Sequence, residues 1–108
     1  MHDPARVEQF AGELDGWTVP ASGGQRALHD QYRELLNSEP SSLSRDREQG
    51  HFTASALMVD PQRASILLVM HPRVKRWLQM GGHIEPGDMS FRDAAARECI
   101  EESGYRNV

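Results

Sequence analysis

The stretch that decides the fold runs from Gly81 to Gly104 and reads GGHIEPGDMSFRDAAARECIEESG. It opens with a turn signal, Glu85-Pro86-Gly87-Asp88, in which proline and glycine favour a loop. Ser90 and Asp93 then have the spacing of a helix-capping pair, and Gly104 is typical of the residue that ends a helix. The sequence therefore predicts a loop followed by a helix that starts after Ser90 and stops before Gly104.

Three glutamates, Glu98, Glu101 and Glu102, share one side of this predicted helix, because residues three and four apart lie one turn from each other. Like charges at this spacing repel by about 0.2–0.5 kcal/mol per pair. The glutamates also lie near the helix C-terminus, where the helix dipole favours cations. A divalent cation such as Mg²⁺ or Mn²⁺ reverses both penalties, since these ions bind clustered carboxylate oxygens. A solvated helix face is the alternative interpretation.

The charge of the chain is concentrated around these glutamates. The whole chain has a net charge of −4, and residues 85–102 alone contain six acidic and two basic residues. An acidic chain of this kind argues against a general nucleic-acid-binding surface. We find no apolar run long enough to cross a membrane and no signal peptide, so we expect a cytoplasmic protein without a membrane partner. The single cysteine excludes an internal disulfide.

The residues before this stretch change from helical to strand-like spacing near residue 50. Apolar residues at helical spacing predict helices over 4–15 and 25–36, and Ser22 with Gln25 has the spacing of a capping box for the second. The segment 37–50 is polar and rich in serine, which predicts a loop or linker.

Three strands are predicted after this linker, at 52–58, 64–70 and 77–80. The segment 64–70 is continuously apolar, which is typical of a strand buried on both faces. Gly81 and Gly82 are expected to end the third strand. Trp77 in that strand is predicted to be a half-buried aromatic, with base stacking as the alternative.

The segment from Gly82 to Tyr105 resembles the Nudix box, G-x5-E-x7-R-E-U-x-E-E-x-G-U, in which U is an apolar residue. The R-E-x-x-E-E-x-G part is matched at every fixed position between Arg97 and Gly104. Asp88 stands where the family has its first glutamate, and eight residues rather than seven separate it from Arg97. This GGHxEPGD form is similar to a variant in many bacterial Nudix proteins. The resemblance is tight over 81–105, looser over 50–80 and weak before residue 50.

The resemblance implies an α+β fold, the Nudix-type α/β/α sandwich, with a mixed sheet and the loop and helix that carry the box. It divides the chain into an N-terminal helical extension with a polar linker, 1–49, and a Nudix domain, 50–108, with its box at 82–105. Nudix domains continue past this helix, so we expect the fold to be incomplete at its C-terminus. The exposed sheet edge then favours a homodimer. Residues 1–49 are a candidate dimerisation arm.

The resemblance also implies a function: a pyrophosphohydrolase that cleaves a nucleoside diphosphate linked to another group, with Mg²⁺ or Mn²⁺ as cofactor. By position in the motif, the catalytic and metal-binding residues are Glu98, Glu101 and Glu102, with the backbone carbonyl of Gly81 as a further metal ligand. One of these glutamates is a candidate general base. Four residues are implied to be structural in the loop and helix: Gly82, Asp88, Arg97 and Gly104. Among them, the resemblance implies that Arg97 pairs with Asp88 and so fixes the loop onto the helix.

Candidate substrate-binding residues are Arg73, Arg76 and His83, whose side chains suit phosphate oxygens. A solvated hairpin tip explains the two arginines equally well, and loop packing explains His83. Cys99 lies at an apolar helix position and is predicted to be a small core residue, not a nucleophile. The alternative function is a non-catalytic Nudix module that binds a nucleotide or a protein partner.

Overall fold

A computed structural model describes residues 3–21 and 23–106. Its helices are α1 (Pro4–Asp15), α2 (Gln25–Ser38), the 3-10 helix η1 (Pro40–Leu43) and α3 (Phe91–Ser103). Its strands are β1 (Thr53–Ala56), β2 (Met58–Asp60), β3 (Ser65–Leu67), β4 (Val69–Met70), β5 (Trp77–Leu78) and β6 (Met80–His83). The α+β class expected from the sequence is confirmed. None of the described helices is long and apolar enough to span a membrane.

The three longer helices begin and end close to the predicted residues. The carboxylate of Asp3 accepts a hydrogen bond from the amide of Ala5 at 3.0 Å, and Pro4 occupies the first turn of α1. Gly24 precedes α2 in the left-handed region at φ 78°. The expected capping residue of α2, Ser22, lies outside the described residues. The predicted linker is not wholly irregular, because it contains η1.

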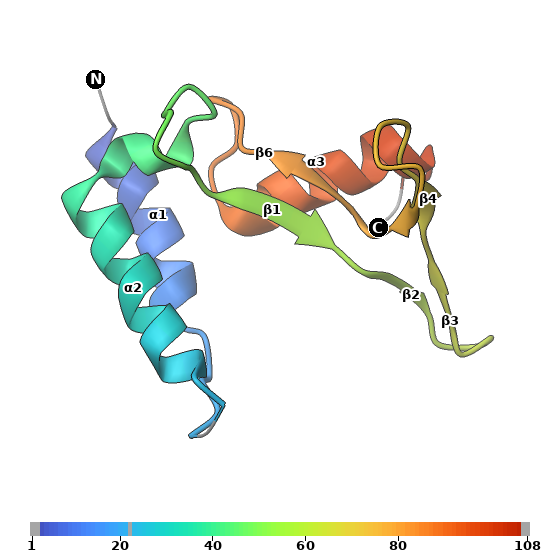
Figure 1. The fold of residues 1–108 in the computed structure, drawn as a ribbon, viewed down its shortest axis with the longest axis horizontal. Helices are drawn as coiled ribbons and strands as arrows, with labels where there is room; N and C mark the ends of the chain where they lie inside the picture. The colour runs from blue at the N-terminus through green and yellow to red at the C-terminus, as the bar shows by residue number, and fades with distance from the viewer. Residues whose placement is uncertain (1–2, 22, 107–108) are drawn as a thin grey trace.

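The strands form three antiparallel pairs, β1 with β6, β2 with β3, and β4 with β5. Within the described residues the pairs do not join into one mixed sheet. The three predicted strands are each divided, because Leu57, Leu68 and Gln79 interrupt the pairing. Figure 1 shows β1, β6 and α3 in the middle of the molecule, with α1 and α2 at one end and the β2–β3 hairpin at the other.

The prediction that Gly81 and Gly82 end a strand is wrong, because both lie inside β6. Gly81 pairs with Ser55 and Gly82 pairs with Ala54. A Cβ added at Gly81 would lie 2.6 Å from the Cβ of Ser55, so only glycine lets the two strands approach this closely. Gly81 therefore serves the close pairing of β1 and β6.

The prediction that residues 64–70 form one strand buried on both faces is also wrong. Ile66 is 52% exposed and Met70 is 47% exposed. Each belongs to a two-stranded hairpin, which leaves much of its surface uncovered. Trp77, in the partner strand of β4, is 63% exposed rather than half-buried.

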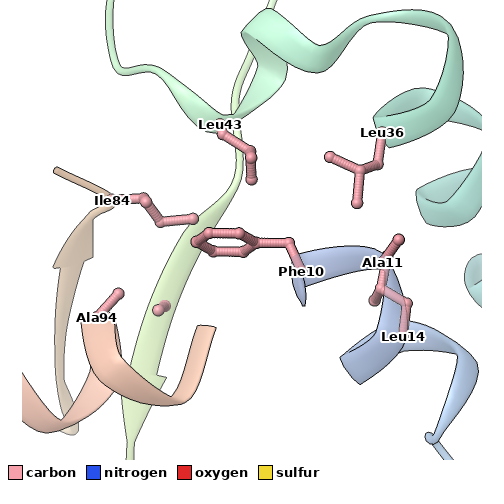
Figure 2. Close-up of a cluster of buried hydrophobic side chains, with 8 residues drawn as sticks. Phe10, Ala11, Leu14, Leu36, Leu43, Ile84 and Ala94 are labelled. Carbon is pink, nitrogen blue, oxygen red and sulfur yellow. The ribbon is translucent and has the colours of Figure 1, made fainter. Parts of the chain in front are cut away.

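One hydrophobic core joins the helical N-terminal region to the strands and α3. Figure 2 shows Phe10 reaching from α1 toward Ile84, with Leu36 and Leu43 above it. The remaining members of this cluster are Ala11, Leu14, Ala54 and Ala94. The buried face of α1 therefore packs against other segments of the same chain, and the core extends across the expected domain boundary at residue 49.

Candidate functional site

The three glutamates of the motif lie on α3, which packs against both β1 and β6 (Figure 1). The start of α3 is fixed by Ser90, whose hydroxyl oxygen accepts a hydrogen bond from the Asp93 amide at 3.0 Å. Its end is fixed by Gly104, which takes the left-handed conformation at φ 80°. Both predicted helix signals are confirmed, so the glutamates have the shared helical face that their spacing predicted.

Two of the glutamates approach adjacent residues of β6. A Cβ added at Gly82 would lie 2.7 Å from Oε1 of Glu98, so that carboxylate covers the glycine directly. Oε1 of Glu102 accepts a hydrogen bond from the amide of Gly81 at 3.4 Å. The two glycines therefore have different roles, since the missing Cβ leaves room for β1 at Gly81 and for the Glu98 carboxylate at Gly82.

Arg97 joins the loop before α3 to the helix itself. Its guanidinium donates to both carboxylate oxygens of Asp88 and, at 2.9 Å, to the backbone carbonyl of His83. The bonds to Asp88 lie at the turn 85–88, where the Asp88 carboxylate also accepts from the Glu85 amide at 2.8 Å. The predicted pairing of Arg97 with Asp88 is present in the structure.

Hydrogen bonding and charge shift the ionisation of this pair. The hydrogen bond from Arg97 holds the pKa of the Asp88 carboxyl below its usual value, against the opposing effect of burial. In return, Asp88 raises the pKa of Arg97 above its usual value. Both groups are therefore charged at neutral pH, and the Asp88 carboxylate joins the loop backbone to Arg97.

Arg97 also contacts two of the candidate metal ligands. Its Nη1 donates to Oε1 of Glu98 at 3.1 Å and to Oε2 of Glu101 at 3.3 Å. Glu85 lies 3.5 Å from the same nitrogen. One guanidinium thus faces four carboxylates, which leaves this side of α3 negatively charged and suited to a cation.

Carboxylate oxygens on one helix face are the hard donors that Mg²⁺ and Mn²⁺ prefer. The chemistry of the donor set therefore fits such an ion. The side chains do not form a complete coordination site. Within residues 3–21 and 23–106, no group of three histidine, cysteine, aspartate or glutamate side chains is arranged to hold a metal ion. Glu101 is 57% exposed and is turned toward Arg97.

Two of the three candidate substrate-binding residues are not brought together with the glutamates. Arg73 and Arg76 are exposed in the turn between β4 and β5, and no hydrogen bond or ion pair in the described part of the chain joins them to α3. The ring of His83 lies 5.0 Å from that of His51. Cys99 is buried, as predicted.

Sequence reasoning missed two residues at this site, Arg6 and Glu13 of α1. Arg6 donates to backbone carbonyls of the loop, and Glu13 accepts hydrogen bonds from the first amides of α3. A signal exists in the sequence. Arg6 lies four residues before Phe10 and Glu13 lies three residues after it, so both flank Phe10 on the apolar face of the helix. A charged pair on a buried face indicates partners elsewhere in the fold.

A sequence model of the NUDIX domain matches residues 50–108, which is more than half of the chain. The chain belongs to the NUDIX family. Members of this family generally hydrolyse phosphoanhydride bonds and generally use divalent metal ions such as Mg²⁺. No curated protein and no solved structure shows a significant match to the chain. The NUDIX match covers β1 to α3, and thus the glycine pair, the Arg97–Asp88 pair and all three glutamates.

Proposed function

We propose that the chain is a divalent-metal-dependent pyrophosphohydrolase that cleaves a nucleoside diphosphate linked to another group. The observation that carries this proposal is the position of two carboxylates. Glu98 and Glu102 approach Gly82 and Gly81, neighbouring residues of β6, from a helix that matches the family motif. This arrangement supports a site for an ion and for phosphate oxygens at the same edge of β6.

Glu98, Glu101 and Glu102 would hold Mg²⁺ or Mn²⁺, together with the backbone carbonyl of Gly81. Such an ion, when bound, would neutralise phosphate oxygens and lower the pKa of water. One of the glutamates would act as general base toward the attacking water. Arg97 would help to orient Glu98 and Glu101 through its hydrogen bonds to both carboxylates.

The substrate side of the proposal rests on charge. Arg73 and Arg76 are exposed cations that suit the phosphates of a nucleotide, and His83 is an exposed side chain at the end of β6. A cytoplasmic location and a homodimer complete the proposal.

The test is a product screen with the 108-residue chain. The chain is incubated with Mg²⁺ or Mn²⁺ and a panel of nucleoside diphosphate derivatives, and products are identified by mass spectrometry. We expect cleavage at the pyrophosphate, and a loss of at least about 100-fold in rate for Glu102→Gln. Glu48→Gln is the matched control, since Glu48 is an exposed glutamate in the linker, and should keep full activity.

Each outcome of this screen bears on the proposal. A chelator should abolish turnover, and excess Mn²⁺ should restore it. Full activity in Glu102→Gln would overturn the assigned role of the glutamates. Tight binding of a nucleotide with no cleavage of any compound in the panel would instead identify a non-catalytic binding module.

A further inference from the structure

The N-terminal helix α1 holds the loop that precedes the glutamate-bearing helix. Nε of Arg6 donates to the backbone carbonyl of Asp88 at 2.7 Å, and its Nη2 donates to the carbonyl of Glu85 at 2.9 Å. These carbonyls belong to the first and last residues of the turn 85–88, which the Asp88 amide closes with a 2.9 Å bond to Glu85. A single guanidinium therefore clamps both ends of the turn, in the fork geometry that arginine provides.

The same helix supplies the N-terminal cap of α3. The carboxylate of Glu13 accepts hydrogen bonds from the amides of Phe91, at 2.5 Å, and Arg92, at 3.0 Å. The Asp93 amide is satisfied by Ser90, and the Ala94 amide begins the helical pattern with the Ser90 carbonyl.

Every one of the first amides of α3 thus has a partner, and two of them depend on a residue about eighty positions away in the chain. A carboxylate at this end is also favoured by the helix dipole. Glu13 therefore supplies a cap that the loop sequence alone does not contain.

Aromatic packing fixes α1 between these two polar contacts. Phe10 is fully buried and meets Phe91 edge to face, with ring centroids 4.7 Å apart. The Arg6 guanidinium lies over the Phe10 ring, 5.1 Å from its centroid. Since Arg6, Phe10 and Glu13 share one face of α1, one rigid helix reaches the loop and the start of α3 together.

These contacts lead directly to the candidate metal ligands. Asp88, whose carbonyl is held by Arg6, binds Arg97 through its carboxylate, and Arg97 contacts Glu98 and Glu101. Glu13 holds the first turn of the helix that carries all three glutamates. We propose that Arg6 and Glu13 are positioning residues, which order the loop 84–90 and the start of α3 and so raise the affinity of the glutamates for a divalent cation. The expected effect on cation affinity rests on the proposed function.

The first measurement is hydrogen exchange of residues 84–92 in the metal-free chain. We compare Arg6→Gln and Glu13→Gln with two matched controls, Arg26→Gln and Glu8→Gln, which make the same charge changes at exposed positions of α2 and α1. The two positioning variants should exchange this segment faster, while the controls exchange it at the wild-type rate. Arg6→Lys should restore part of the protection, because lysine can still donate to a carbonyl.

The second measurement is the dissociation constant for Mn²⁺, by titration calorimetry. We expect it to rise about three- to tenfold in the two positioning variants, somewhat less than the effect of removing a group that contacts a metal ligand directly. The controls should bind Mn²⁺ as the wild type does. Unchanged exchange in Arg6→Gln and Glu13→Gln would overturn the proposal.

Two mixed outcomes are also decisive. Faster exchange with an unchanged Mn²⁺ affinity would overturn the positioning role and leave α1 as a structural support. Failure of the wild-type chain to bind Mn²⁺ would overturn the proposed function together with the expected effect on cation affinity, whereas the exchange rates would still decide whether α1 orders the loop.

Discussion

Arg97 and Asp88 form a bidentate ion pair, with Nε of Arg97 3.0 Å from Oδ1 of Asp88 and Nη2 2.9 Å from Oδ2. Asp88 is only 5% exposed, and its carboxylate also accepts a hydrogen bond from the loop backbone. The other edge of the guanidinium contacts Glu98 and Glu101. One side chain therefore couples the closure of the loop to the placement of the glutamates.

The Arg97–Asp88 pair should contribute strongly to stability. Asp88→Asn keeps the shape of the side chain but removes its charge, which leaves a partly buried guanidinium without its main partner. We expect the free energy of unfolding to fall by about 2–4 kcal/mol, as measured by urea denaturation at pH 7. Asp46→Asn, at an exposed position in the linker, should change it by less than about 0.5 kcal/mol. Equal effects of the two variants would contradict this prediction.

The same pair should make stability depend on acid. The hydrogen bond from Arg97 lowers the pKa of Asp88 from its ordinary value of 3.8. Because the folded state holds the proton less tightly than the unfolded state, the pair stabilises the fold fully above the ordinary pKa. This contribution is lost as the pH falls through the lowered pKa.

Urea denaturation of the wild type and of Asp88→Asn at pH 7, 5, 4 and 3 measures this dependence. The difference between their free energies of unfolding should be constant from pH 7 to pH 5 and should shrink below about pH 4. A difference that grows as the pH falls would show that the predicted direction of the pH dependence is wrong.

The parts of the fold that are fixed by local chemistry could be predicted from the sequence. The ends of α1 and α3 depend on nearby caps, such as Ser90 and Gly104, so their sequence signals were sufficient. The burial of residues 64–70 could not be predicted in this way, because it depends on what covers each hairpin. Ile66 is apolar but faces no second layer over much of its surface.

The candidate site shows the same division. The motif correctly predicts the pairing of Arg97 with Asp88, since both residues lie within one loop and helix. The contacts of Arg6 and Glu13 with that loop span about eighty residues. No local sequence pattern specifies a contact partner so distant in the chain. The apolar face of α1 therefore predicts only where on the helix the Arg6 and Glu13 side chains lie.

The two neighbouring glycines of β6 should respond differently to alanine. A Cβ at Gly81 would lie 2.8 Å from the backbone carbonyl oxygen of Ala54, so Gly81→Ala must separate β1 from β6. We expect it to destabilise the fold by about 1–3 kcal/mol in urea denaturation. A Cβ at Gly82 instead meets the end of the flexible Glu98 side chain. Gly82→Ala should therefore change stability by less than about 1 kcal/mol.

Gly82→Ala should act on cation binding instead, because it displaces the Glu98 carboxylate. We expect the dissociation constant for Mn²⁺, measured by titration calorimetry, to rise by at least about tenfold, since even the loss of a group that only supports a metal ligand has an effect of this size. Alanine at Gly87, where an added Cβ meets nothing within 4 Å, is the matched control and should leave the affinity unchanged. Wild-type affinity in Gly82→Ala would argue that Glu98 is not a ligand.

Phe10 should be among the residues on which the whole fold depends, although it lies outside the segment that matches the family. It is fully buried and packs against Phe91 at the start of α3. We expect Phe10→Ala to lower the free energy of unfolding by about 3–5 kcal/mol, since it leaves a cavity between α1 and the strands. Leu28→Ala, at a position of α2 that is 40% exposed, should cost about 1 kcal/mol or less. A small loss in Phe10→Ala would mean that residues 50–106 fold without α1, and the core drawn in Figure 2 would then be an accessory contact.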